Sequence, residues 1–134
     1  MDWNKPSTVD VIKQRLAWLD QRQQVLARNI ANSDTPKFTP SDLKPPRVED
    51  AARPPAGGLP LAVTAPTHLP GVTRGHASFA VVSAPDSDPS PSGNAVDLEQ
   101  QAAKLSETAL THKFATQLYR KYLGMIRIAT NSRG

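Results

Sequence analysis

Few side chains in this sequence could do chemistry, and their spacing does not bring them together. The three histidines, His68, His76 and His112, fall in two expected loops and one expected helix, without the short intervals typical of metal ligands. The chain contains no cysteine, so it offers no thiolate ligand, thiol nucleophile or disulfide. We therefore expect no metal site and no cofactor, and we interpret His112 as a hydrogen-bonding residue of a helical interface.

The carboxylates and glycines do not predict an enzyme either. Asp86 and Asp88 lie in a polar stretch, residues 83–93, whose composition is typical of a linker. A linker cannot hold a carboxylate with the accuracy that general acid–base catalysis requires. Gly57 and Gly58 lack the remainder of a phosphate-binding loop and predict only a turn. The sequence therefore predicts a protein that is not an enzyme.

The distribution of proline divides the chain into three parts. Of the 13 prolines, 12 fall between Pro36 and Pro91, and the other is Pro6. Because proline breaks helices, this leaves two long arms able to be helical. We predict a mainly α fold with an N-terminal helix in residues 1–35, an irregular middle in 36–93 and a C-terminal helix in 94–134.

The N-terminal arm has a clear start and two apolar lines. Ser7 or Thr8 can cap the helix, with Asp10 in its first turn. A heptad-like seam recurs in steps of three and four: Val9, Ile12, Leu16, Leu19, Gln23, Leu26 and Ile30. A second line, Val11, Trp18 and Val25, follows one flank and indicates at least two packing neighbours. The helix must end before Pro36, and Asn32 can adopt the left-handed conformation of a helix terminus.

The C-terminal arm repeats this pattern. Asn94 or Asp97 can cap its helix. Its seam is Leu98, Ala102, Leu105, Ala109, His112, Thr116, Tyr119, Leu123, Ile126 and Thr130. A second stripe is Leu110, Phe114, Leu118, Met125 and Ile128. The distal half is thus apolar over far more than the ~100° that one partner covers.

The middle segment predicts little regular structure. Short β-branched runs near 60–64 and 79–82, separated by turn-forming residues, predict a short β-hairpin. A two-stranded unit is marginal alone and needs a helix to pack against. The rest of the segment is expected to be extended or irregular.

Composition and charge restrict the function. Hydrophobic content is 38% and aromatic content 5%, which is low for a self-sufficient domain. The net charge of +4 is spread without a basic stripe, so we expect no nucleic-acid partner. No apolar run approaches the ~18 residues of a membrane span, and residues 1–6 do not resemble a secretory signal peptide.

We predict that the two helices pair as an antiparallel coiled-coil-like hairpin. The seam of this pair is expected to contain Leu16, Leu19, Leu26, Ile30, Leu105, Tyr119, Leu123 and Ile126. The flanking stripes are expected to contact neighbouring subunits through Val11, Trp18, Val25, Leu110, Phe114, Leu118, Met125 and Ile128. The alternative is that both sets form the ordinary core of a self-contained helical hairpin.

The end of the N-terminal arm carries a family motif. Asn29-Ile30-Ala31-Asn32, followed after two residues by Thr35-Pro36, resembles the N-terminal motif of bacterial flagellar axial proteins, which build the rod, hook and hook-filament junction. The short length and the stretches 61–70 and 93–99 resemble the proximal rod members. The family usually continues with Gly-Tyr, where this chain has Lys37-Phe38. Since lysine adopts positive φ less readily than glycine, we expect a differently built turn here.

The resemblance implies a structural function. Proximal rod proteins are exported through the flagellar type III apparatus without a cleaved signal peptide and assemble into the periplasmic rod of the basal body. Their terminal helices surround the export channel in a helical tube that transmits torque. The implied partners are a FliE-type adaptor at the rod base, other proximal rod proteins and copies of the same chain. Two other functions stay open: another flagellar axial protein, or a free-standing amphipathic coiled-coil protein that binds an acidic or membrane surface.

Overall fold

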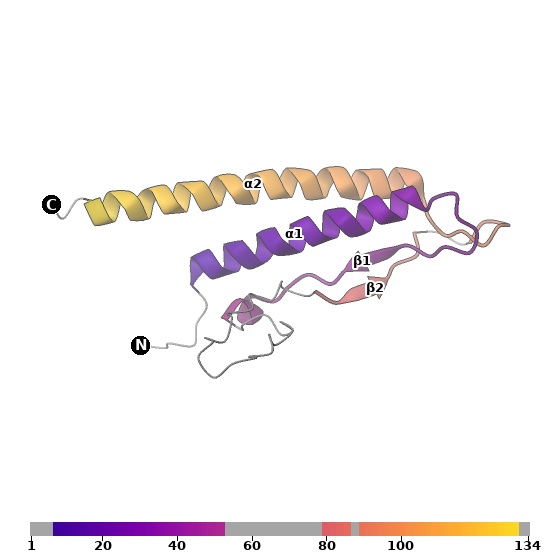
Figure 1. The fold of residues 1–134 in the computed structure, drawn as a ribbon, viewed down its shortest axis with the longest axis horizontal. Coiled ribbons are helices and arrows are strands. Elements are labelled where there is room, and N and C mark those ends of the chain that lie inside the picture. Colours follow the sequence, from indigo (N-terminus) through magenta and orange to yellow (C-terminus); the bar gives the residue numbers. More distant parts are fainter. Residues whose placement is uncertain (1–6, 53–78, 87–88, 132–134) are drawn as a thin grey trace, which may run out of the picture.

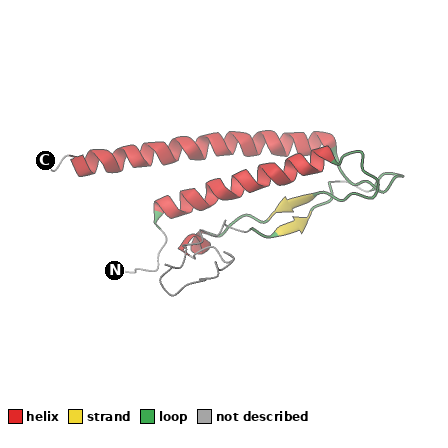
Figure 2. Cartoon of the chain, in the orientation of Figure 1, coloured by secondary structure: helices red, strands yellow, loops and turns green. Residues whose placement is uncertain are grey.

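The chain folds around one helix that has a partner on each side. A computed structural model describes residues 7–52, 79–86 and 89–131. Its elements are α1 (Thr8–Ala31), β1 (Ser41–Leu43), the 3-10 helix η1 (Val48–Ala52), β2 (Val81–Ser83) and α2 (Leu98–Asn131). α1 and α2 lie side by side in opposite directions, and the strands follow the other side of α1 (Figure 1). The prediction of a mainly helical fold with two terminal helices is confirmed, and the structure also has a small two-stranded antiparallel sheet (Figure 2).

Side chains at both ends of α1 satisfy its unpaired backbone groups. At the start, Ser7 Oγ accepts from the Asp10 amide at 3.2 Å, and Asp10 Oδ2 accepts from the Ser7 amide at 3.3 Å. This reciprocal capping box explains why the helix begins at Thr8. At the end, Asn32 has φ −106° and ψ 16° rather than the expected left-handed conformation. Its Nδ2 donates to the Arg28 carbonyl at 2.8 Å, so the side chain helps close the last turn.

α2 is capped by the second of its two candidates. Asp97 Oδ1 accepts hydrogen bonds from the amides of Glu99 at 3.0 Å and Gln100 at 3.2 Å. Asp97 is therefore the residue that caps the helix. Asn94, the other candidate, is buried and directs its amide toward the end of α1.

The hydrophobic core joins all three layers. Trp18 and Leu19 of α1, Leu43 of β1 and Ala115 of α2 form one buried cluster, with Leu16, Val25 and Phe79 packed against it. Because Trp18 and Leu19 are adjacent on a helix, they point in different directions and can contact both the sheet and α2. Both apolar sides of α1 are therefore covered by other parts of the same chain, the sheet on one side and α2 on the other.

The sheet differs from the hairpin that the sequence predicts. β2 overlaps the expected strand near 79–82, but its partner is β1, in a register that places Ser41 opposite Ser83 and Leu43 opposite Val81. The predicted partner strand near 60–64 lies outside the described residues. Residues 41–43 are a three-residue Ser-Asp-Leu strand without an alternating pattern, so β1 carries no recognisable strand signal.

The face of α2 that packs inside the chain is not its apolar stripe. The buried residues of α2 are Gln101, Thr108 and Ala115, which recur every seven residues. Small and polar side chains therefore form the centre of the contact with α1. α2 also has 34 residues against 24 in α1, so it is roughly 15 Å longer at 1.5 Å per residue. Its C-terminal end projects beyond the start of α1 (Figure 1). Within the described residues, neither helix is apolar enough over sufficient length to cross a membrane.

Candidate assembly interface

Asn29, the first residue of the family motif, closes the edge of β1. Its Nδ2 donates to the Ser41 carbonyl at 2.7 Å, and its Oδ1 accepts from the Ser41 amide at 3.1 Å. The side-chain amide thus pairs with Ser41 as a neighbouring strand would. Asn29 is only 1% exposed, so these bonds form away from water, where an unpaired backbone group is costly. A helix residue therefore anchors a strand that is too short to hold itself.

The same side chain begins a chain of buried polar contacts. Asn29 Nδ2 also donates to Gln101 Oε1 at 3.0 Å, and Gln101 Nε2 donates to Asp86 Oδ2 at 2.6 Å. Lys104 Nζ forms an ion pair with the other oxygen of Asp86. We call Asn29, Gln101, Asp86, Lys104 and Asn94 the polar joint, because together they connect the end of α1, the strands and the start of α2.

Asp86 is held firmly, contrary to the loose linker expected from the sequence. Its side chain has no exposed surface, and its amide donates to the Ala95 carbonyl at 3.3 Å. Burial alone would raise the pKa of Asp86, but hydrogen bonds from Gln101 and Lys104 outweigh it and leave the pKa below its usual value. The carboxylate is therefore ionised and structural. Asp88 lies outside the described residues.

The second half of the motif meets Asn94. Asn94 Nδ2 donates to the carbonyls of Asn32 at 3.1 Å and Thr35 at 2.7 Å, and its Oδ1 accepts from the Val96 amide. Thr35 Oγ1 in turn bonds Asn32 Oδ1 at 3.2 Å. One buried asparagine therefore fixes the end of α1 against the segment that leads into α2. Of the other motif residues, Ile30 is partly buried, and Ala31 and Pro36 are exposed.

Lys37 adopts a conformation that lysine enters less readily than glycine. Its φ is +60°, in the left-handed region, so the expectation of a differently built turn is wrong. The turn is kept because Lys37 N donates to the Ser92 carbonyl at 3.2 Å and the next residue donates from Phe38 N to the Thr35 carbonyl. Gly93, with φ +79°, approaches so closely that a Cβ there would lie 3.2 Å from Lys37 Cγ.

Lys37→Gly is expected to raise the free energy of unfolding by about 0.5–1 kcal/mol, because the strain of a left-handed lysine disappears. Gly93→Ala is the reciprocal control, with an expected loss of about 1 kcal/mol from positive φ and the contact with Lys37. Thermal melts followed by circular dichroism measure both. A lower melting temperature for Lys37→Gly would show that the lysine side chain stabilises the turn.

Arg22 of α1 provides a second side-chain contact to β1, through Asp42. Its guanidinium forms two parallel bonds with Asp42, Nε to Oδ1 and Nη2 to Oδ2, each 2.8 Å long. Burial raises the pKa of Asp42, but the hydrogen bonds from Arg22 outweigh that effect, and the pKa lies below its usual value. The Arg22 guanidinium also lies 5.2 Å from the centre of the Trp18 ring, and Arg15 lies 4.4 Å from it.

The two depressed carboxylate pKa values make the fold sensitive to acid. Since the folded pKa of Asp42 and Asp86 lies below the unfolded value of 3.8, each carboxylate stabilises the fold fully above that value. The contribution is lost as the pH falls through about 4 toward the folded pKa. We expect the melting temperature to decline below about pH 4, and Asp42→Asn to flatten this decline while lowering stability at neutral pH. An unchanged acid slope in Asp42→Asn would contradict the assignment.

The residues expected in the seam differ in burial. Leu19 and Leu26 are buried, Leu16, Ile30, Leu105 and Tyr119 are partly buried, and Leu123 and Ile126 are exposed. The last two lie on the same line of α2 as Tyr119. By the register of the Asn29–Gln101 and Asp20–His112 contacts, they come level with the first turn of α1 or beyond its start, so little of α1 lies against them. His112 of α2 lies within reach of α1, with Nε2 2.9 Å from Asp20 Oδ1.

On α1, the flank expected to contact another subunit is partly internal. Trp18 is 3% exposed and donates from Nε1 to the Lys44 carbonyl at 2.9 Å, and Val25 packs against the same core. Assigning Trp18 to a subunit contact is therefore wrong, because the second neighbour of α1 is the chain's own sheet. Val11 is partly buried.

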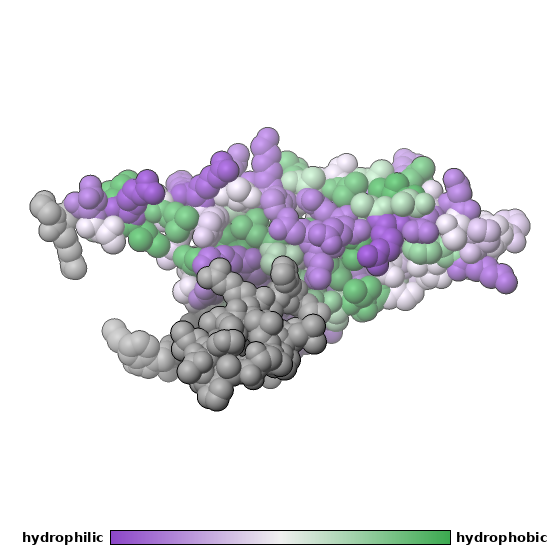
Figure 3. All heavy atoms as spheres, in the orientation of Figure 1, coloured by the Kyte–Doolittle hydropathy of each residue, from purple (hydrophilic) through white to green (hydrophobic). Residues whose placement is uncertain are grey.

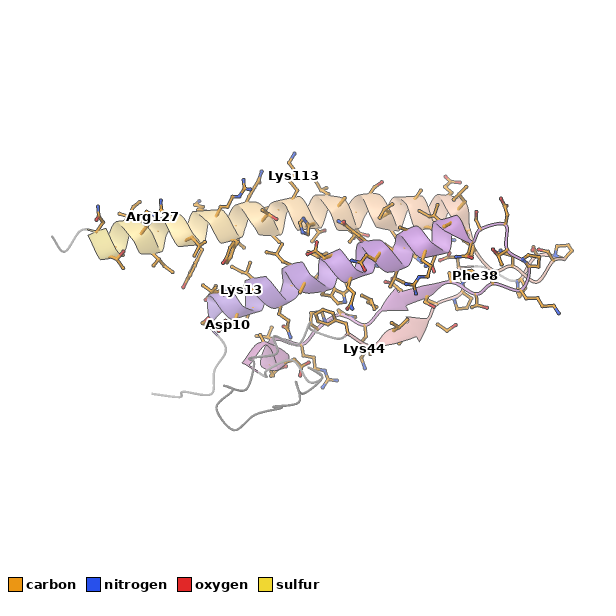
Figure 4. All side chains as sticks on the ribbon, viewed as in Figure 1. Asp10, Lys13, Phe38, Lys44, Lys113 and Arg127 are labelled. Atoms are coloured by element: carbon orange, nitrogen blue, oxygen red, sulfur yellow. The ribbon has the colours of Figure 1, made fainter. Side chains whose placement is uncertain are left out.

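On α2, the stripe expected to contact another subunit is not covered by any part of the chain that the structure describes. The outer stripe (Leu110, Phe114, Leu118, Met125 and Ile128) is between 45% and 72% exposed. Figure 3 shows hydrophobic and hydrophilic residues interspersed along this helix. Lys113 projects from the middle of α2 on the side away from α1, whereas Phe38 lies toward the end of the molecule where α1 stops and α2 begins (Figure 4). Large apolar groups exposed in a row on one face are typical of an interaction surface.

Comparison with known proteins assigns this chain to a family. The chain matches no known family model. It is similar to the flagellar basal body rod protein FlgB of Salmonella typhimurium, 28% identical over 113 residues that cover 81% of this chain and 82% of the relative. FlgB of Yersinia enterocolitica is 30% identical over 102 residues, 73% of each chain. The chain belongs to the FlgB family. FlgB of Agrobacterium fabrum is 29% identical over 120 residues, 87% of each chain.

Membership of the FlgB family makes this chain a structural protein of the flagellar basal body rod. The names of its relatives describe a rod component and indicate no catalytic activity. Among the described residues, no group of three or more His, Cys, Asp or Glu side chains could hold a metal ion.

Proposed function

We propose that this chain is a subunit of the proximal rod, exported by the flagellar type III system without a cleaved signal peptide. It occupies the periplasmic part of the basal body. There α1 and α2 pair in a coiled-coil-like manner within a helical tube that transmits torque and surrounds the export channel. Its partners are a FliE-type adaptor at the rod base, other proximal rod proteins and copies of itself.

The outer stripe of α2 is the observation that supports this proposal. The internal contact of α2 is centred on Gln101, Thr108 and Ala115, so the larger apolar side chains are left for other chains. Burial of such side chains contributes roughly 25 cal/mol per Å² of apolar surface. A helix that gives its apolar face to neighbours gains most of its stability only in an assembly.

The same exposure of apolar side chains on α2 implies that the chain completes its folding when it assembles. Long helices depend on tertiary packing for most of their stability. Here α2 projects past the start of α1 (Figure 1), and Leu123 and Ile126 are exposed in the C-terminal third of α2. We assign these two residues to subunit contacts as well, together with Val11 on α1. Neighbours that bury them offset the entropy of ordering the end of α2.

The proposal is tested by placing a charge in the outer stripe. At a protein concentration low enough to keep the chain monomeric, Leu118→Asp is expected to leave the melting temperature nearly unchanged, since Leu118 is exposed. The same variant is expected to abolish rod assembly and swimming in the source bacterium. Ala109→Asp, which adds the same charge at an exposed position of α2 away from the outer stripe, is the matched control and is expected to retain assembly. A destabilised monomer, or normal swimming of the Leu118→Asp strain, would contradict the proposal.

Circular dichroism of the isolated chain tests the folding step. We expect helicity to increase when a FliE-type adaptor is added, because new contacts order the projecting end of α2. An equal helical content with and without the adaptor would show that assembly and folding are separate.

A further inference from the structure

The outer face of α2 is symmetric in its chemistry about Phe114. Leu110 and Leu118 lie four residues before and after it, and Glu107 and Lys121 lie seven residues before and after it. Ala103 and Met125 follow at eleven residues on either side. Steps of three, four and seven keep all of these positions on one face of a helix. The face therefore has the same apolar pattern in both directions, with opposite charges at equivalent places.

This symmetric face is accessible along its whole length. Ala103, Glu107, Leu110, Phe114, Leu118, Lys121 and Met125 are all exposed. Neither Glu107 nor Lys121 forms a salt bridge among the residues that the structure describes. α1 packs on the line of Gln101, Thr108 and Ala115 instead, so it does not obstruct a partner on the symmetric face.

We propose that the symmetric face binds a second copy of this chain, with the two α2 helices antiparallel and Phe114 at the two-fold axis. Leu110 of each copy then lies opposite Leu118 of the other, and Ala103 lies opposite Met125. Glu107 lies opposite Lys121 twice, once on each side of the axis. Such an interface is isologous, so it closes as a dimer.

Charge complementarity selects this arrangement over parallel ones. Two parallel helices in register would place Glu107 against Glu107 and Lys121 against Lys121, which is repulsive. A parallel shift of fourteen residues would form one Glu107–Lys121 contact and remove Phe114 from the centre. Only the antiparallel arrangement pairs both charges and both leucines. Opposed helix dipoles favour it further.

The dimer does not depend on the rod assignment, although it uses the surface that we assign to rod neighbours. Outside the rod, the second copy would cover the apolar face and keep it from non-specific contacts. Entry into the rod would then exchange one helix partner for another. The oligomeric state in solution and assembly into the rod can therefore be measured separately.

Charge reversal tests the pairing in solution with the full chain. Glu107→Lys is expected to weaken the dimer at least about tenfold, because two attractive contacts become repulsive, and Lys121→Glu should act alike. The double variant Glu107→Lys/Lys121→Glu should restore dimerisation to within about threefold of the original chain, since each opposed pair again has opposite charges. Sedimentation equilibrium measures the three constants. A monomeric original chain, or a double variant as weak as the singles, would overturn the proposal.

A single cysteine tests the antiparallel register. Because the chain has no cysteine, Phe114→Cys introduces the only thiol, and it would face its own equivalent across the two-fold axis. We expect mild oxidation to link most of the chain into dimers, whereas Gln24→Cys on the exposed side of α1 stays monomeric. Equal crosslinking of both variants, or none for Phe114→Cys, would refute the register. Swimming of the Glu107→Lys/Lys121→Glu strain reports separately on the rod, so the two proposals can fail independently.

Discussion

Trp18→Ala is expected to destabilise the isolated chain by about 3–4 kcal/mol, the usual cost of removing a buried aromatic side chain. Trp18 is almost fully buried at the centre of the core, where α1 meets β1. The substitution leaves a cavity, removes the donor to the Lys44 carbonyl and takes away the ring over which Arg15 and Arg22 lie. Urea unfolding followed by circular dichroism measures the loss.

Phe114→Ala is the matched control for this variant. Phe114 is 67% exposed in the single chain, so its truncation is expected to change the free energy of unfolding of the monomer, measured in dilute solution, by less than about 0.5 kcal/mol. The two aromatic residues belong to flanks that look alike in the sequence, so the comparison separates an internal core residue from a surface one. Equal losses from Trp18→Ala and Phe114→Ala would contradict the layer arrangement, in which only α1 is covered on both sides.

Asn29→Leu is expected to cost about 3 kcal/mol and to detach β1 from α1. Leucine has the same branched shape as asparagine, but it is bulkier and wholly apolar, and it leaves the amide and carbonyl of Ser41 and the oxygen of Gln101 without their partner. Each buried polar group left unpaired costs about 1–3 kcal/mol, reduced where water can enter. Hydrogen exchange of the Ser41 amide should increase strongly, because Asn29 Oδ1 is its acceptor.

Two further variants, Asn29→Asp and Asn32→Ala, distinguish the loss of the Asn29 hydrogen bonds from a weaker end of α1. Asn29→Asp keeps the acceptor for the Ser41 amide but cannot donate to Ser41 or Gln101, so it should weaken the joint while leaving Ser41 partly protected. Asn32→Ala removes an exposed contact with the Arg28 carbonyl and should cost only about 1 kcal/mol. If Asn32→Ala were as harmful as Asn29→Leu, the motif would act mainly as a helix stop.

The helices could be predicted from the sequence because their signals are local. Pro36 and the proline-rich segment after it bound α1, Ser7 and Asp10 form its capping box, and the heptad pattern fixes the helical period. The polar joint could not be predicted in the same way. Asn29 and Asp86 are separated by more than fifty residues, and their pairing through Gln101 exists only once the chain has folded.

Apolar periodicity does not predict which side of α2 packs inside the chain. Apolar periodicity identifies which side of a helix needs cover, and for α1 that cover is inside the chain. For α2 the internal side is Thr108 and Ala115, whereas the stripe around Phe114 is exposed. Hydrophobicity alone cannot tell a core from an interface, because the same physical force drives burial in both. Lys37 shows a second limit, since backbone hydrogen bonds can hold a residue where its own preference would not place it.

The unequal length of the two helices has a mechanical consequence. The Asn29–Gln101 bond joins α1 to α2 near the start of α2, and Ala115 packs against Trp18 and Leu19 further along. The C-terminal end of α2 continues beyond the start of α1 (Figure 1). We expect this end to bend more easily than the packed part, because a helix without tertiary contacts keeps less of its stability. One sequence can thus fit neighbours whose surfaces differ in curvature, without remaking its buried bonds.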